Sequence, residues 1–131
     1  MKTKSIVILA IFAVVLSACN LQIGDLNIRT ISGSGNQVTE ERAVSGFNAV
    51  QLKGIGNLEI TQGNTEKLVV EADDNIMPLI ETEVINSELV IRLKEGTMIT
   101  DANSITYKLT VKDLEAISLS GLGNATAGDL K

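Results

Sequence analysis

Apolar and polar residues alternate along most of the chain from Ile31 onward. Short runs of Val, Ile, Leu and Thr are separated by Gly, Asn and Asp, which is typical of strands joined by turns. Because successive side chains of a strand point to opposite faces, each run has one apolar face to bury. The runs predict strands at residues 49–53, 57–62, 67–72, 81–85, 88–94, 105–112 and 116–120. The pattern therefore predicts an all-β protein.

Residues 73–80 break this alternation. Asp73 and Asp74 precede a short apolar stretch, and Pro78 lies early enough to be tolerated in a first helical turn. We expect one short helical turn there, with the two acids as caps. The same acids would suit a calcium site or a catalytic pair, but no further acids follow at the spacing of a calcium loop. Capping is the preferred interpretation.

Asn86 and Ser87 separate two apolar runs. Asn readily adopts left-handed backbone angles, so this pair predicts the turn of a β-hairpin.

An internal repeat is the most informative feature of the sequence. Residues 47–57 align with residues 114–124 without a gap, with five of eleven positions identical and three more exchanging one apolar residue for another. A shorter third copy covers residues 31–36. Each copy ends in Gly-x-Gly-Asn, and the corner residues are Gly33, Gly35 and Asn36; Gly54, Gly56 and Asn57; and Gly121, Gly123 and Asn124.

A strand followed by such a corner predicts the same bend in each copy, because Gly permits positive φ and Asn tolerates it. Stacked copies would bury apolar faces that no single copy covers, as in a solenoid. Chance recurrence of glycine-rich turns is the plainer alternative. A phosphate-binding loop fits poorly, because a predicted strand and no helix follows Asn57.

The first 19 residues resemble a secretion signal. Lys2 and Lys4 precede an apolar run of 11 residues, from Ile6 to Leu16, which is too short to span a bilayer of about 30 Å as a helix. Leu-Ser-Ala-Cys, ending at Cys19, resembles the lipobox of bacterial lipoproteins. We expect residues 1–18 to be a signal peptide, Cys19 to carry lipid, and residues 19–30 to form a tether that includes at most a short strand. An ordinary signal beside an incidental cysteine is the alternative.

Charge and composition exclude several functions. The formal net charge is −5 and no cluster of Lys and Arg occurs, so we expect neither nucleic acid nor anionic lipid as an electrostatic partner. Cys19 is the one cysteine, which rules out disulfides within the chain and thiol nucleophiles in residues 31–131. With no histidine, the commonest general base and the usual zinc ligands are missing. We expect no cofactor and no metal.

Carboxylate pairs remain the one enzymatic option that the composition leaves open. The candidate acids are Glu59, Glu71, Asp73, Glu81 and Glu83. Sugar binding is poorly supported, because the only aromatic rings after Cys19 belong to Phe47 and Tyr107.

Several blocks of the sequence together resemble the putative auto-transporter adhesin family known as the head GIN domain. These blocks lie at residues 33–36, 40–42, 44–47, 54–63 and 70–75, and the resemblance extends over residues 33–131. It implies a right-handed parallel β-helix-like solenoid, spanning residues 31–131 here, and it brings no catalytic residues.

The resemblance also implies further strands beyond the second long repeat, so we expect the solenoid to be C-terminally incomplete at Lys131. An open solenoid end would invite self-association. We therefore expect an adhesin-like binding module at the cell envelope, in the outer membrane if there is one and otherwise on the outer face of the cytoplasmic membrane. A structural or sensory envelope protein acting through protein partners is the alternative, and a polysaccharide-active enzyme is a weaker one.

Overall fold

The computed structural model describes residues 27–128 and 130. The predicted signal peptide, Cys19 and the first part of the tether lie outside the described residues. Within the described part the elements are β1 (Arg29–Ser32), β2 (Gln37–Arg42), β3 (Ala49–Gln62), β4 (Lys67–Asp73), a 3-10 helix η1 (Met77–Leu79), β5 (Ile80–Ile85), β6 (Glu88–Leu93), β7 (Thr97–Thr100), β8 (Thr106–Val111) and β9 (Ala116–Ala127).

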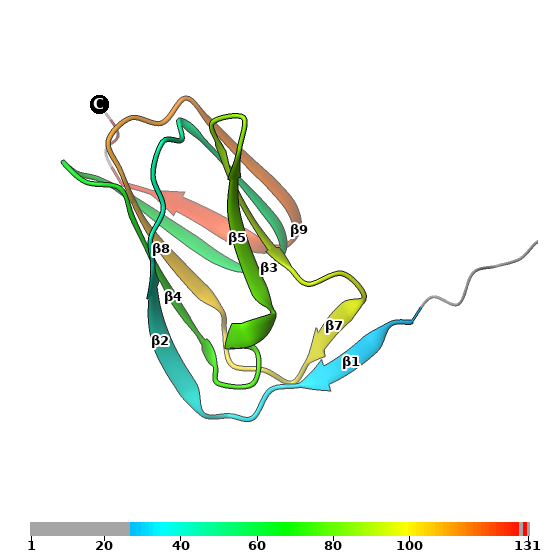
Figure 1. The fold of residues 1–131 in the computed structure, drawn as a ribbon. Coiled ribbons are helices and arrows are strands. Elements are labelled where there is room, and N and C mark those ends of the chain that lie inside the picture. Colours follow the sequence, from blue (N-terminus) through cyan, green and yellow to red (C-terminus); the bar gives the residue numbers. More distant parts are fainter. Residues whose placement is uncertain (1–26, 129, 131) are drawn as a thin grey trace, which may run out of the picture.

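The strands form one large sheet and one small sheet. The large sheet runs β2-β4-β8-β3-β6-β5, and β9 pairs with β3; β1 and β7 form a separate two-stranded sheet. The large sheet curls into a half-barrel, with the β1–β7 pair beyond one end of it (Figure 1). The predicted all-β class with one short helical turn is confirmed.

Parallel and antiparallel pairs are mixed. β3 lies parallel to β6, β8 and β9, whereas the β2–β4, β4–β8 and β5–β6 pairs are antiparallel. The described part is therefore not built of parallel pairs alone, as the expected parallel β-helix-like solenoid would be. A short connection permits only an antiparallel pair, and this applies to β5 and β6.

Asn86 and Ser87 form the two-residue turn of the β5–β6 hairpin. Both have positive φ, at 49° and 63°, as a tight hairpin turn requires. Ile85 pairs directly with Glu88 across it. The predicted hairpin is confirmed.

β3 is one strand of 14 residues where the sequence pattern predicts two. Before its Gly54–Gly56 corner it pairs with β6, from Ala49 to Lys53, and after the corner it pairs with β8, from Asn57 to Gln62. The corner is thus the point at which β3 exchanges one neighbour for another, while β9 follows it on the opposite edge.

The core lies inside the curl of the large sheet. Its buried side chains come chiefly from alternate positions of β3, β4, β6 and β8: Val50, Leu52, Leu58, Ile60, Leu68, Val70, Leu89, Ile91, Tyr107, Leu109 and Val111. Phe47 is also buried. Both aromatic rings of the described residues therefore pack inside the protein and leave none for stacking on a sugar.

The helical turn η1 forms without a side-chain cap. Its N-cap residue is Ile76, and Pro78 lies in its first turn as predicted. The expected capping by Asp73 and Asp74 is wrong, because their carboxylates bind another loop. Arg42 supports the turn instead: Nη1 donates to the Ile80 carbonyl at 2.5 Å and Nη2 to the Met77 carbonyl at 3.1 Å.

Candidate functional site

The two long sequence repeats lie side by side in the sheet. β9 pairs with β3 in parallel over twelve residues, from Ala49–Ala116 to Ile60–Ala127. Gly54 lies opposite Gly121, Gly56 opposite Gly123, and Asn57 opposite Asn124. The structural register is the same as the alignment of the two sequence copies.

Close backbone approach explains the glycines at this corner. A Cβ atom on Gly121 would overlap the backbone of Gly54, and one on Gly123 would overlap the carbonyl oxygen of Gly56. Gly54 and Gly121 also share a positive φ, 119° and 127°, which side chains rarely adopt. The glycines allow two identical bends to lie against each other.

The third copy of the motif lies elsewhere. Gly33, Gly35 and Asn36 connect β1 to β2 and are not opposite the other two corners. They are tied to residues 73–75: the Gly35 N–H donates to Asp73 Oδ2 at 3.1 Å, and Asn36 Nδ2 donates to Asp74 Oδ2 at 2.9 Å. This glycine-containing copy closes a loop rather than adding a third layer to the stack.

Asp73 is the centre of this loop contact, which we call the Asp73 latch (Gly33–Asn36, Asp73–Asn75 and Asn103). Its side chain is fully buried and also accepts a hydrogen bond from Asn103 Nδ2 at 2.7 Å. A Cβ atom on Gly33 would overlap the Asp73 carboxylate, so only glycine fits there. The latch joins three segments that are far apart in the sequence.

Hydrogen bonds hold both carboxyl groups of the latch in their ionised forms. Burial raises the pKa of Asp73, but the hydrogen bonds from Asn103 and Gly35 outweigh it and the pKa lies below its usual value. The hydrogen bonds from Ser34 and Asn36 lower the pKa of Asp74. These hydrogen bonds account for both ionised carboxylates without a bound metal ion.

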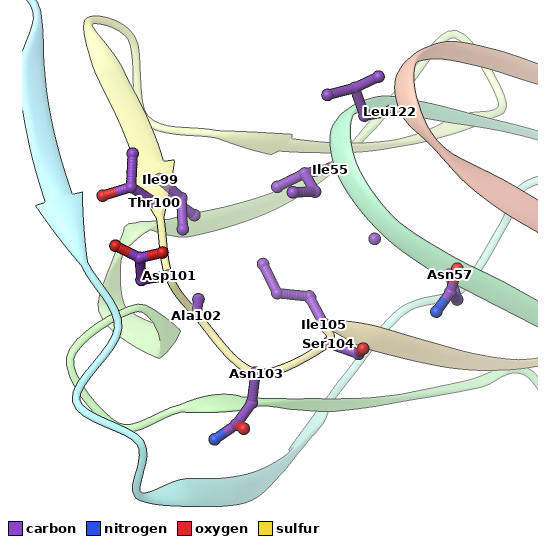
Figure 2. Close-up of a pocket in the computed structure, with 11 residues that line it drawn as sticks. Ile55, Asn57, Ile99, Thr100, Asp101, Ala102, Asn103, Ser104, Ile105 and Leu122 are labelled. Carbon is purple, nitrogen blue, oxygen red and sulfur yellow. The ribbon is translucent and has the colours of Figure 1, made fainter.

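A pocket of about 280 Å³ lies beside the glycine corner. It separates the corner of β3 from the loop between β7 and β8, and the side chain of Leu122 from β9 stands at its border (Figure 2). Ile55 and Ile105 point into this space, whereas Asn103 turns away toward the Asp73 latch (Figure 2). The lining therefore combines these apolar side chains with polar residues, chiefly of the loop between β7 and β8.

A second cavity of about 250 Å³ adjoins the first. The two share Ile55, Ile99 and Leu122, and the second continues toward Leu93 and Met98. Together they form an apolar depression along the corner, which we call the corner depression.

The chemistry of the larger pocket limits what it can bind. Its lining includes no Lys or Arg, and Asp101 is its one carboxylate. An anionic ligand would find no counter-charge there, and a single carboxylate does not supply the acid and base of a glycosidase. The pocket suits an uncharged group that contacts both its apolar side chains and its polar loop residues.

Three of the acids named as candidates for a carboxylate pair, Glu71, Glu81 and Glu83, lie in ion pairs. Glu71 contacts Lys108 at 2.6 Å, and Arg92 lies between Glu81 at 3.0 Å and Glu83 at 3.8 Å. Among the described residues no group of three or more His, Cys, Asp or Glu could hold a metal ion. Across residues 27–128, no helix is long and apolar enough to cross a bilayer.

The sequence pattern did not predict the corner depression. The Asp, Asn and Ser residues at 101–104 are recognisable as a loop, but a cavity appears only when this loop meets the corner of β3 and Leu122. The glycines were predicted as corners, and Gly54, Gly56 and Gly121 do border this site.

The chain belongs to the family described as "Putative auto-transporter adhesin, head GIN domain", whose model matches residues 46–131. This confirms the resemblance found in the sequence. No protein of curated function matches the sequence.

Solved structures share the fold. A putative adhesin from Bacteroides fragilis superposes with a TM-score of 0.70 at 24% identity, covering 76% of this chain and 46% of that one. A putative lipid binding protein from Parabacteroides distasonis gives 0.69 at 23% identity, covering 76% and 44%. A putative adhesin from Parabacteroides merdae gives 0.66 at 22%, covering 75% and 42%. This chain spans less than half the length of each.

Proposed function

We propose that this chain is an adhesin-like binding module that is exported and held at the bacterial cell envelope by a lipid on Cys19. Membership of the adhesin-like family supports the binding role. The basic, apolar and small-residue segments that end at Cys19 support export and lipid attachment. Two or more acyl chains would make the anchor stable, whereas one alone binds a membrane weakly.

Asn20 favours the outer membrane as the destination in a cell that has one, because it is not the aspartate associated with inner-membrane retention in enteric bacteria. In a cell with one membrane, its outer face is the expected location.

The observation that carries the binding role is the corner depression. Its larger pocket, about 280 Å³, is slightly smaller than the roughly 300–1,000 Å³ of typical small-molecule sites. The adjoining cavity is lined mainly by apolar residues, and the described residues offer no exposed aromatic ring to stack on a sugar. We infer that the depression receives an apolar side chain from a polypeptide partner.

Non-enzymatic binding is preferred over polysaccharide cleavage. The pocket contains a single carboxylate, and four of the candidate acids, Glu71, Asp73, Glu81 and Glu83, are engaged by Lys108, Asn103 and Arg92. A purified protein that hydrolyses an envelope or plant polysaccharide would overturn this preference.

Attachment assays test the binding role. Cells displaying the protein would be compared on surfaces coated with fibronectin, collagen or dextran. Leu122→Asp places a charge on an exposed side chain at the border of the pocket, so we expect attachment to a protein-coated surface to fall on the order of tenfold, the effect of about 1.4 kcal/mol.

The matched control is Val84→Asp, which places the same charge on exposed β5 and should leave attachment unchanged. Equal attachment by cells with and without the protein on all three surfaces would refute the binding role. Attachment to dextran alone would refute the polypeptide ligand.

The anchor is tested separately with Cys19→Ser. We expect loss of labelled palmitate incorporation and release of the protein from the membrane fraction. Retention of both lipid and membrane association in this variant would show that Cys19 is not the lipidation site.

A further inference from the structure

The small β1–β7 sheet has an exposed apolar row on its outer face. Thr30 lies opposite Met98 in the parallel pair, and paired residues direct their side chains to the same face. Ile28 precedes Thr30 by two residues, so its side chain lies on that face as well. Ile28 and Met98 are 52% and 53% exposed. Ile31 and Ile99 take the other face of the sheet and pack against the core.

This sheet is the part of the protein that the N-terminal segment joins. The β1–β7 pair lies beyond one end of the half-barrel (Figure 1). Residues of β7 line both cavities of the corner depression, whereas neither lining includes a residue of β1. β1 therefore lies on the side of β7 away from Leu122, and Ile28 belongs to the end of the protein nearest the predicted anchor.

The chain between Cys19 and this sheet is short. Residues 20–28 number nine, and a fully extended chain of that length spans at most about 30 Å. Leu21, Ile23 and Leu26 lie within it, and Asp25 is its one charged residue. Apolar residues near a lipid anchor favour the membrane interface over water. Both the length and the composition of this segment place Ile28 close to the lipid surface.

The charges of the sheet suit this location better than those of β2 and β5. β1 and β7 contain Arg29 and no acid, whereas β2 and β5 contain two glutamates each. Taking an ionised carboxylate out of water is costly. Glu95 and Asp101 flank β7 at its two ends, so a contact with lipid is confined to the depth of the headgroups.

We propose that the outer face of the β1–β7 sheet, through Ile28 and Met98, lies against the surface of the membrane that holds the anchor. This contact rests on the lipid attachment at Cys19 proposed above. Because the anchor already holds the chain at the membrane, the contact forms at a high effective concentration and a small apolar area is sufficient. The segment after Cys19 then keeps the module close to the bilayer instead of extending it outward.

Depth-dependent fluorescence quenching tests the contact. The lipidated chain is reconstituted into phosphatidylcholine vesicles, with or without spin-labelled phosphatidylcholine. Thr30→Cys places a thiol between Ile28 and Met98 for a nitrobenzoxadiazole label, and a lipidated Cys19 has no free thiol to compete. We expect spin-labelled lipid to lower the emission about twofold, since the label lies within the headgroup region. The matched position is Asp113→Cys, exposed beyond the other end of β8, where the emission should not change.

Ile28→Asp, added to labelled Thr30→Cys, should restore the emission, because it places a charge on the contact face. Ile28 is exposed and lines neither cavity, so the fold and the corner depression are left intact. Val84→Asp, the same change on exposed β5, should leave the quenching as it is. Quenching that persists in Ile28→Asp would overturn the proposal.

Flotation of the vesicles on a density gradient separates this contact from the anchor. A chain that floats with the vesicles but is quenched no more at Thr30→Cys than at Asp113→Cys retains its anchor, and this result overturns the contact alone. A chain that does not float with the vesicles overturns the anchor and the contact that rests on it.

Discussion

β3 and β9 carry the two long copies of the repeat and pair in register, yet they occupy opposite environments. Leu52 is 2% exposed in β3, and its counterpart Leu119 is 45% exposed in β9. Ile55 is half-buried at the first corner, and its counterpart Leu122 is 78% exposed at the second. The repeat therefore specifies how the chain bends and pairs, whereas burial depends on whether another strand or loop lies next to it.

The largest expected effect comes from truncating the paired leucines. Leu52→Ala removes buried methyl groups and should lower the free energy of unfolding by about 2–5 kcal/mol. Leu119→Ala removes half-exposed groups and should cost less than about 1 kcal/mol. Urea denaturation of both variants at dilute protein concentration measures the difference. An equal loss of unfolding free energy in both variants would mean that Leu119 is as well covered as Leu52.

A smaller effect is expected when the close contact between the corners is disturbed. Gly123→Ala places a methyl group against the Gly56 carbonyl oxygen, which cannot move without shifting β3. We expect a loss of about 1–3 kcal/mol, the usual cost of overpacking. Thermal unfolding measures it, with Gly128→Ala as control, because a Cβ there meets only the Ile60 carbonyl oxygen at 3.9 Å. An unchanged midpoint for Gly123→Ala would contradict the tight stacking.

The third copy of the motif, unlike the two long copies, binds an ionisable side chain, that of Asp73. Its contribution to the stability of the fold should therefore depend on pH. The pKa of Asp73 is lowered in the folded protein, so ionised Asp73 stabilises the fold above its ordinary value of 3.8. This stabilisation is lost as the pH falls from 3.8 through the lower folded value. Thermal midpoints recorded from pH 7 to pH 2 should therefore fall less steeply at the acid end for Asp73→Asn than for the wild type.

The same variant should be less stable at pH 7, because one carboxylate acceptor is replaced by an amide donor that faces Gly35 or Asn103. Asp113→Asn, an exposed substitution on a loop, is the control. A wild-type acid profile in Asp73→Asn would show that the latch does not depend on this carboxylate.

Apolar alternation predicted the strands that line the core and missed β1, β2 and β7, which contain no buried residue. Leu68, Val70 and Ala72 alternate in β4, and Tyr107, Leu109 and Val111 alternate in β8, so both strands were predicted close to their observed bounds. β2 has one apolar residue, Val38, among six. It is a strand because β4 supplies a hydrogen-bonding partner along its length. Such strands are determined by tertiary pairing, which a local pattern does not contain.

The corners illustrate the same limit. Shared Gly-x-Gly-Asn motifs with matching flanks at residues 47–57 and 114–124 correctly indicated neighbouring strands. The copy at residues 31–36 has no matching flank. Its Gly33 serves close approach to Asp73 and Ala102 instead, and its Gly35 has a positive φ of 80°. The same local need for a residue without a side chain arises from two different contacts. The corner depression was not predicted for a related reason, since its walls come from three distant segments.

The Asp73 latch determines how mechanical load would enter the protein. Hydrogen bonds join residues 34–36, which follow β1, to residues 73–75, which lie much later in the sequence. If the membrane anchor pulls on the N-terminal segment, tension reaches the short β1–β7 pair first and the latch next. The latch passes this load to residues 73–75 at the end of β4, so β2 is shielded from part of it while the latch holds.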